Sequence, residues 1–101
     1  MTPAEAQALL ADCRRKIDAI DVELRDLLNR RAAIVDNVVR AKEALGMPVY
    51  EAAREEEVLR KATTGNHGPL SNEAFQHIFE TIMREMRMIQ QVYLDQRQGK
   101  Q

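Results

Sequence analysis

The segment that decides the fold is residues 2–45, TPAEAQALLADCRRKIDAIDVELRDLLNRRAAIVDNVVRAKEAL. No Gly or Pro occurs between Pro3 and Gly46, so nothing in this segment ends a helix early. Apolar residues recur at the a and d positions of successive heptads, a pattern typical of a helix that pairs with another helix. The a positions are Leu10, Ile17, Leu24, Arg31, Val38 and Leu45, and the d positions are Cys13, Ile20, Leu27, Ile34 and Ala41.

The length of this helix has a consequence for assembly. At 1.5 Å per residue it is about 60 Å long, whereas a compact chain of 100 residues has a radius of gyration of roughly 13 Å. The rest of one chain cannot wrap such a helix, so a second copy must cover part of the apolar stripe. The sequence therefore predicts a homodimer.

The composition predicts a single all-α domain over residues 1–101, because hydrophobic residues make up 45% and aromatic residues only 4%. A net charge of −1 argues against a nucleic-acid partner. The sequence shows neither a signal peptide nor a long apolar run, so we expect no membrane partner. The single cysteine, Cys13, fits a reducing compartment, and we expect a cytoplasmic protein.

Two further helices are predicted after Gly46, which can end the first helix in the left-handed conformation. The second spans about Glu51–Thr63, with Ala52, Glu55, Val58, Leu59 and Ala62 near one face. The third is capped by Ser71 or Asn72 and runs to about Gln98, and residues 96–101 form a frayed tail. Its apolar stripe is Phe75, Ile78, Phe79, Ile82, Met83, Met86, Ile89, Tyr93 and Leu94.

Arg31 is a charged residue in the apolar stripe of the first helix. It either extends its charge to solvent and fixes the register of the pair, or faces a cavity and binds an anion. Lys42 projects only about 20° from Arg31, about 16 Å along the axis. Two such cations repel unless an acid or a ligand lies between them. Arg14 points about 100° away from Arg31 and would more easily serve a site on a partner subunit.

Three polar residues of the other helices complete the candidate set. Gln90 lies in the apolar stripe of the third helix, either as a hydrogen-bonded core residue or as a neutral donor in a dry site. Glu51 and Glu55 are four residues apart and share a helix face. Charged neighbours such as Arg54 are ordinarily solvated.

Other chemistries find no support in the sequence. His67, His77 and Cys13 make no metal-ligand set, and no glycine-rich phosphate loop occurs. Residues for nucleophilic catalysis are not arranged in any recognisable motif. We therefore expect no metal and no organic cofactor.

These residues resemble the all-helical class of chorismate mutases, in which three helices per chain, one long, one short and one of intermediate length, form an intertwined homodimer with two active sites. The resemblance extends from about residue 9 to about residue 94. Its motifs are weak singly and specific in their joint order and spacing. They are residues 14–21, 27–32 and 41–42, followed by 48–51, 54–55 and 89–90.

The resemblance implies a role for each candidate. Arg14, supplied by the other subunit, would hold the side-chain carboxylate of chorismate, and Arg31 the ring carboxylate. Lys42 would contact the ether oxygen and the side-chain carboxylate, and Gln90 would donate to the ether oxygen from the opposite side. The remaining substrate-binding positions are Glu55 with Glu51 at the ring hydroxyl, Arg54, and Met86.

Two of these positions depart from the family pattern. Glu51 stands where bacterial members commonly have Asp, and Met86 stands where a small polar residue is often found. We expect the hydroxyl contact of Glu51 to be longer or lost, and one carboxylate contact to be absent at position 86. Neither departure removes a main cationic contact.

The implied reaction is the pericyclic rearrangement of chorismate to prephenate in phenylalanine and tyrosine biosynthesis, which needs no proton transfer and no nucleophile. Three alternatives stay open. The first is a lyase on the same fold that eliminates pyruvate from isochorismate. The second is a non-catalytic helical dimerisation module, in which Arg31, Lys42 and Gln90 are paired internally. The third is a regulatory or fused mutase domain cut from a larger enzyme.

Overall fold

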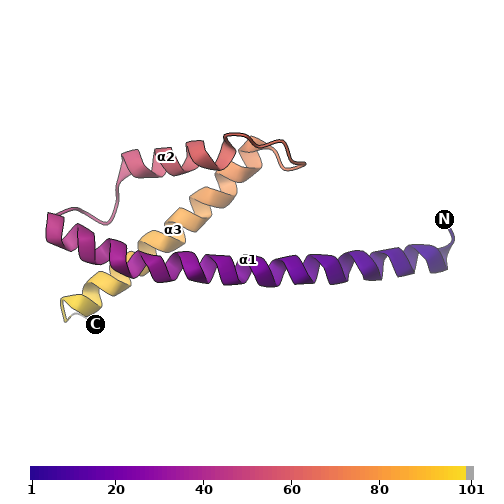
Figure 1. Ribbon diagram of the computed structural model, residues 1–101, viewed down its shortest axis with the longest axis horizontal. Helices are drawn as coiled ribbons and strands as arrows, with labels where there is room; N and C mark the ends of the chain where they lie inside the picture. The colour runs from indigo at the N-terminus through magenta and orange to yellow at the C-terminus, as the bar shows by residue number, and fades with distance from the viewer. Residues whose placement is uncertain (100–101) are drawn as a thin grey trace. The chain divides into compact units, whose positions relative to one another are not determined.

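The computed structural model describes residues 1–99 and consists of three helices, which confirms the all-α prediction (Figure 1). Helix α1 spans Pro3–Leu45, helix α2 spans Ala52–Thr63, and helix α3 spans Asn72–Arg97. No strand occurs in this part of the chain. None of the helices in the described residues is long and apolar enough to cross a membrane.

Both ends of α1 follow from local sequence. The Thr2 hydroxyl accepts a hydrogen bond from the Glu5 amide at 3.1 Å, and Glu5 Oε1 accepts one from the Thr2 amide at 3.3 Å. This reciprocal pair is a capping box. At the other end Gly46 has φ +68°, and the Met47 amide donates to the Lys42 carbonyl at 2.8 Å. The predicted left-handed termination at Gly46 is thereby confirmed.

The starts of α2 and α3 differ in how they are capped. Helix α2 begins one residue later than predicted, because Glu51 is its N-cap residue, and the Glu51 side chain makes no capping hydrogen bond. Helix α3 is capped by Ser71, whose hydroxyl accepts from the Ala74 amide at 3.0 Å. A hydroxyl at this position satisfies one of the free amides of the first turn.

The predicted frayed tail begins too early. Gln96 and Arg97 are helical, and Arg97 Nη2 lies 2.9 Å from Glu43 Oε1 of α1. This contact supplies a tertiary reason for the last turn to stay helical. Gln98 and Gly99 form a turn after the helix, and the part of the prediction at Lys100 and Gln101 lies outside the described residues.

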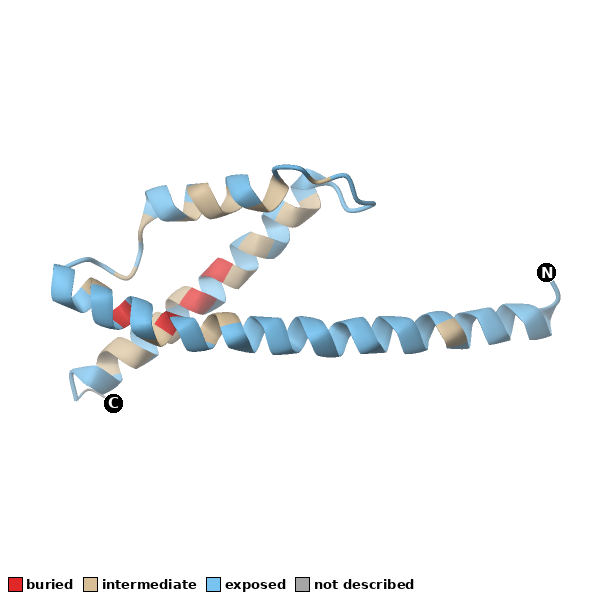
Figure 2. Ribbon diagram, in the orientation of Figure 1, coloured by how far each residue is buried: buried red, intermediate tan, exposed pale blue. Residues whose placement is uncertain are grey.

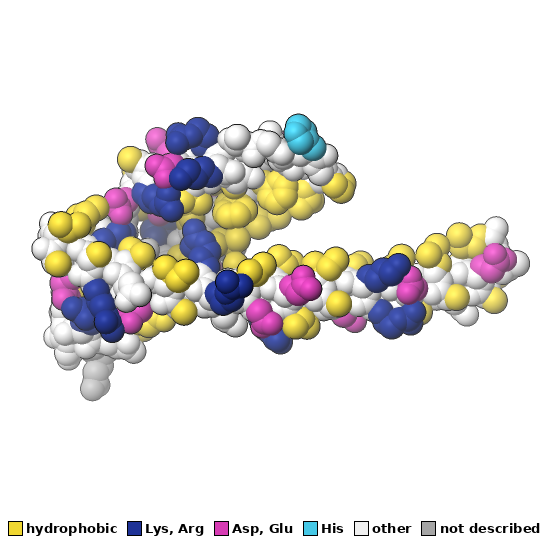
Figure 3. Space-filling view, viewed as in Figure 1, with side chains coloured by type: hydrophobic (Ala, Val, Ile, Leu, Met, Phe, Trp, Pro, Cys, Tyr) yellow, Lys and Arg dark blue, Asp and Glu magenta, His cyan; other side chains and the backbone are white. Residues whose placement is uncertain are grey.

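The chain divides into two compact units, of which the first is Met1–Ala33 and the second begins at Ile34. The first unit is one helical segment whose large apolar side chains are exposed in a single chain, and Figure 3 shows hydrophobic side chains all along it. They include Leu10, Ile17, Ile20, Leu24 and Leu27. A single domain over residues 1–101 stays a prediction.

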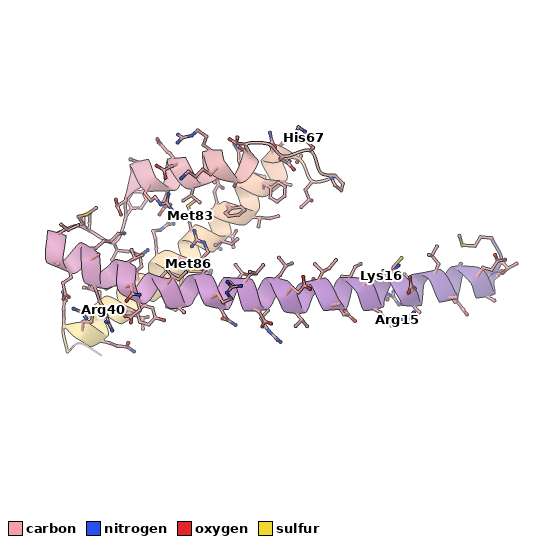
Figure 4. The ribbon with its side chains drawn as sticks, in the orientation of Figure 1. Arg15, Lys16, Arg40, His67, Met83 and Met86 are labelled. Carbon is pink, nitrogen blue, oxygen red and sulfur yellow. The ribbon has the colours of Figure 1, made fainter. Side chains whose placement is uncertain are left out.

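The second unit contains the buried core, which Figure 2 shows on the end of α1 and on α3. Helix α2 packs along α3. Two of the core residues, Met83 and Met86, lie one turn apart on α3 (Figure 4). Ala52 on α2 and Ile78 on α3, which the sequence places on the apolar faces of these helices, are exposed in the single chain. The buried side chains are Val35, Val39, Met83 and Met86.

The last turns of α1 present two different faces. Val35 and Val39 are buried in the second unit, whereas Ile34 and Leu45 of the heptad stripe are 64% and 72% exposed. At about 100° per residue, Val35 and Val39 lie on a separate face from that stripe. The chain therefore packs its own core on one face of α1 and leaves the other uncovered.

We expect Ser71→Ala to lower the free energy of unfolding by about 1 kcal/mol, because the Ala74 amide loses its capping partner. The matched control is Thr81→Ala, which removes a hydroxyl from the interior of the same helix, where it bonds the His77 carbonyl at 3.1 Å. Such a back-bond adds little to helix stability, so this change should be near neutral. Urea unfolding at one fixed protein concentration measures both, and equal losses would contradict the capping assignment.

Candidate functional site

The centre of the candidate site is the ammonium group of Lys42, whose side chain is 12% exposed. Lys42 Nζ donates to the Val49 carbonyl at 2.7 Å and to Gln90 Oε1 at 3.0 Å. It also lies 3.1 Å from Glu51 Oε1. A lysine ammonium has three N–H donors, and two of them are used in these hydrogen bonds. The Glu51 carboxylate neutralises the charge.

Each acceptor comes from a different segment, and local sequence explains its position. The left-handed residue Gly46 ends α1, and Pro48 favours an extended chain that brings the Val49 carbonyl back toward Lys42. Glu51 is the N-cap residue of α2, and its carboxylate contacts Lys42 in place of a helix amide. Gln90 lies one turn after the buried Met86 on α3.

Gln90 makes a hydrogen bond to another helix, as the hypothesis of a hydrogen-bonded core residue predicts. Its amide oxygen accepts from Lys42, so its amide nitrogen is the group that can donate to another molecule. The direct bond between Lys42 and Gln90 is also the internal pairing that the non-catalytic alternative predicts for these two residues. The pair brings a cation and a neutral donor together, without any nucleophile.

Glu55, which the sequence places near the apolar face of α2, reaches α3. It forms an ion pair with Arg87 of α3, through Oε1 and Nη1. The Arg87 guanidinium also lies 5.5 Å from the centre of the Tyr50 ring. Sequence reasoning missed Arg87, although an arginine between Met86 and Gln90 adjoins the apolar stripe and could have been noticed for that reason.

Arg54 is exposed and pairs along its own helix with Glu57. Glu57 also lies 3.1 Å from Lys61 Nζ. The Lys61 hydrogen bond and charge, followed by those of Arg54, hold the pKa of the Glu57 carboxyl below its usual value. These three side chains form a charged surface on α2, and a role for Arg54 in substrate binding stays a prediction.

The remaining candidates fall in different places. Met86 is buried, and a thioether is only a weak acceptor, so it can contact a ligand only through its apolar surface. Arg14 is exposed and Arg31 is half-buried, and both belong to the first unit. Their roles in binding, and that of Arg14 in a partner's site, stay predictions.

The site has the properties of a prearranged polar cluster. Within residues 1–99, no buried side-chain nitrogen or oxygen lacks a hydrogen-bond partner. The same residues contain no group of three or more His, Cys, Asp or Glu side chains placed to hold a metal. The cluster can therefore bind and polarise an anionic or ether oxygen by its cation and amide.

The sequence profile of the family described as chorismate mutase type II matches residues 13–91. The chain belongs to the chorismate mutase type II family. The matched residues include the Lys42 cluster and both charged partners of the Arg87–Glu55 pair. The resemblance drawn from the sequence motifs is confirmed.

Two curated relatives show different domain organisations within the type II family. A chorismate mutase of Methanocaldococcus jannaschii is 30% identical over 94 residues, which are 90% of this chain and 93% of that protein. A bifunctional chorismate mutase/prephenate dehydratase of Pseudomonas aeruginosa is 36% identical over 90 residues, 84% of this chain and 25% of that protein. The chain thus spans about a quarter of the length of such bifunctional relatives.

A solved structure of the chorismate mutase from Helicobacter pylori in complex with prephenate shares the fold. Its TM-score is 0.81 at 30% sequence identity, and the match covers 87% of this chain and 96% of that chain. The three-helix architecture is therefore that of known chorismate mutases.

The pKa of Glu57 offers a test of how Arg54 and Lys61 are arranged on α2. We expect Lys61→Met to raise this pKa, and Arg54→Met to raise it by less, because the Lys61 interactions are the larger cause. Added salt should raise it in the wild-type chain, since the charges are exposed. NMR titration of the carboxyl measures each value, and an unchanged pKa in Arg54→Met would show that Arg54 points elsewhere.

The lowered pKa of Glu57 also determines how its contribution to the stability of the fold changes with pH. The folded-state pKa of Glu57 lies below its unfolded value, so its contribution is present above the unfolded pKa. The contribution is lost as the pH falls through the folded value. Because the group is exposed, the effect is small and is screened by salt.

Proposed function

We propose that the chain is a cytoplasmic chorismate mutase that converts chorismate to prephenate for phenylalanine and tyrosine biosynthesis. The observation that carries the proposal is the Lys42 cluster, in which α3 presents Gln90 to a nearly buried ammonium of α1. Family membership and the prephenate complex of the Helicobacter pylori relative support it.

The chemistry of this reaction suits the cluster. As the C–O bond of chorismate breaks, the ether oxygen gains negative charge. Lys42 and Gln90 can donate to that oxygen in a site of low dielectric constant, and one fixed donor of this kind is worth about 3 kcal/mol. Holding the dianion in a compact conformer removes a further part of the barrier.

Substrate binding requires an exchange of partners at Lys42, because its ammonium already donates to two acceptors and forms an ion pair with Glu51. Glu51 is the acceptor best suited to leave, since it is a side chain that is 30% exposed and an anion, like the carboxylate that would replace it. The released carboxylate starts from the N-cap of α2, one turn from Glu55. Glu55 can then accept from the ring hydroxyl, and the contact of Glu51 with that hydroxyl is the one we expect to be longer or lost.

The proposed enzyme is an intertwined homodimer with Arg14 supplied in trans. The heptad stripe supports this, because its side chains are exposed in one chain while Val35 and Val39 form the internal core. Burying an apolar stripe against a second copy is strongly favourable, at roughly 25 cal/mol per Å². The angle of about 100° between Arg14 and Arg31 directs them to different sites.

The first test is to mix the chain with chorismate, follow the loss of its absorbance, and identify the product. We expect prephenate, formed without added metal or cofactor. Lys42→Met should lower kcat/KM by a factor of about 100–1000, because the ether oxygen loses its charged donor. Arg40→Met is the matched control, since Arg40 is an exposed cation of the same helix paired with Asp36 at 3.3 Å.

Three outcomes would contradict the proposal. A dimer that leaves chorismate unchanged would favour the non-catalytic module. Pyruvate formed from isochorismate, with chorismate untouched, would favour the lyase. Equal activities of Lys42→Met and Arg40→Met would remove Lys42 from the catalytic site.

The shared site can be tested by mixing two inactive variants, Arg14→Ala and Arg31→Ala. In a mixed dimer with Arg14 acting in trans, one site lacks both arginines and the other has both. Random pairing makes half of the dimers mixed, so roughly a quarter of wild-type activity should return after co-refolding. Activity assays and native mass spectrometry measure the recovery and the fraction of mixed dimers.

The opposite arrangement gives a different result. If Arg14 acted in cis, every site in the mixture would lack one arginine and no activity would return. Folded monomers at micromolar concentration in sedimentation would contradict the homodimer itself. An active Arg14→Ala chain would transfer the role to Arg15.

A further inference from the structure

Arg87 on α3 makes contacts that the proposed mechanism does not use. Its Nη1 forms an ion pair with Glu55 Oε1 of α2. Its guanidinium lies 5.5 Å from the centre of the Tyr50 ring, in the connection before α2. The Arg87 side chain is 32% exposed and that of Glu55 is 21% exposed, so both lie partly inside the second unit. One side chain thus joins α3 to α2 and to residue 50.

We propose that Arg87 is a positioning residue, which holds the Glu55 carboxylate ready to accept a hydrogen bond from the ring hydroxyl of the substrate. This inference rests on the proposed function. The ion pair uses Oε1 of Glu55, so a hydroxyl can donate to Oε2. Arg87 itself makes no contact with the reacting atoms in this arrangement.

Fixing the carboxylate before binding has a physical benefit. A free glutamate side chain loses rotamer entropy when it binds a ligand, and a bonded one has lost it already. The adjacent cation also offsets the desolvation of the carboxylate when a substrate covers it. Glu55 can then bind a neutral hydroxyl without leaving an uncompensated charge in the site.

The contact with Tyr50 extends this effect to the centre of the site. Tyr50 lies between Val49, which accepts a hydrogen bond from Lys42, and Glu51, which forms an ion pair with it. A guanidinium over an aromatic ring is attracted by the electrons of that ring. Arg87 therefore restrains the backbone that orients the Val49 carbonyl and the start of α2.

The test compares Arg87→Met with Arg84→Met, a control that removes an exposed cation from the same helix. We expect Arg87→Met to raise KM roughly 10-fold and to leave kcat within about twofold, because the hydroxyl takes no part in the bond changes. Arg84→Met should leave both constants unchanged. Chorismate is the substrate, and circular dichroism checks the fold of each variant.

A second substrate separates positioning from a purely structural role. In a chorismate analogue whose ring hydroxyl is replaced by hydrogen, Glu55 has nothing to bind. Wild type and Arg87→Met should then have KM values within about twofold of each other. A general disturbance of the site would raise KM for both substrates, which would overturn the inference.

A double-mutant cycle with Glu55→Gln tests the pair directly. If Arg87 acts through Glu55, adding Arg87→Met to Glu55→Gln should raise KM little further. Additive increases would overturn the inference. If Arg87→Met does not fold, Arg87→Lys replaces it, because this change keeps the positive charge. Its KM for chorismate should then rise by less than roughly 10-fold, and its KM for the analogue without the ring hydroxyl should match that of the wild type.

The proposed function and this inference fail in different ways. A wild-type chain without mutase activity refutes the function. An active wild type with equal KM values for Arg87→Met and Arg84→Met refutes only the role of Arg87.

Discussion

The arrangement of the second unit depends on the solvation of one ammonium group. A nearly buried cation is costly unless hydrogen-bond acceptors replace the water it has lost. Lys42 obtains two acceptors, from the connection after α1 and from α3, and an ion pair with Glu51, the residue before α2. The same contacts that stabilise the charge hold these segments together. The Lys42 ammonium, the group proposed to act in catalysis, therefore also stabilises the fold.

This dual use explains two irregular features. Glu51 occupies the N-cap position of α2 without capping it, because its carboxylate neutralises Lys42. Gln90 interrupts the apolar stripe of α3, because an amide oxygen is needed where the helix passes Lys42. Both residues depart from what the local helix prefers, a capping side chain at Glu51 and an apolar one at Gln90, and each makes a contact with Lys42 instead. Such conflicts between local preference and global structure are typical of functional sites.

The sequence alone predicts the structure well where contacts between residues close together in the chain decide it. Thr2, Gly46 and Ser71 mark helix ends through contacts within a few residues. Gly46 acts as predicted, and Ser71 is the cap of the two residues that the sequence offered. Lys42 could be singled out because it projects on the same side as Arg31, and Gln90 because a polar residue in an apolar stripe needs a partner. The ion pair of Arg87 with Glu55 could not, because charged residues are common on helix surfaces. Which of them meet depends on the rotation of α2 against α3.

Lys42 is bonded through both its backbone and its side chain to the connection that follows it. Its carbonyl accepts from the Met47 amide, and its ammonium donates to the Val49 carbonyl. Surface connections usually tolerate inserted or deleted residues. The connection after α1 is bonded to Lys42 at both Met47 and Val49. An inserted or deleted residue would therefore displace one of these two hydrogen bonds. Homologues that keep the lysine should therefore vary in length elsewhere, as in the turn around Gly65 between α2 and α3.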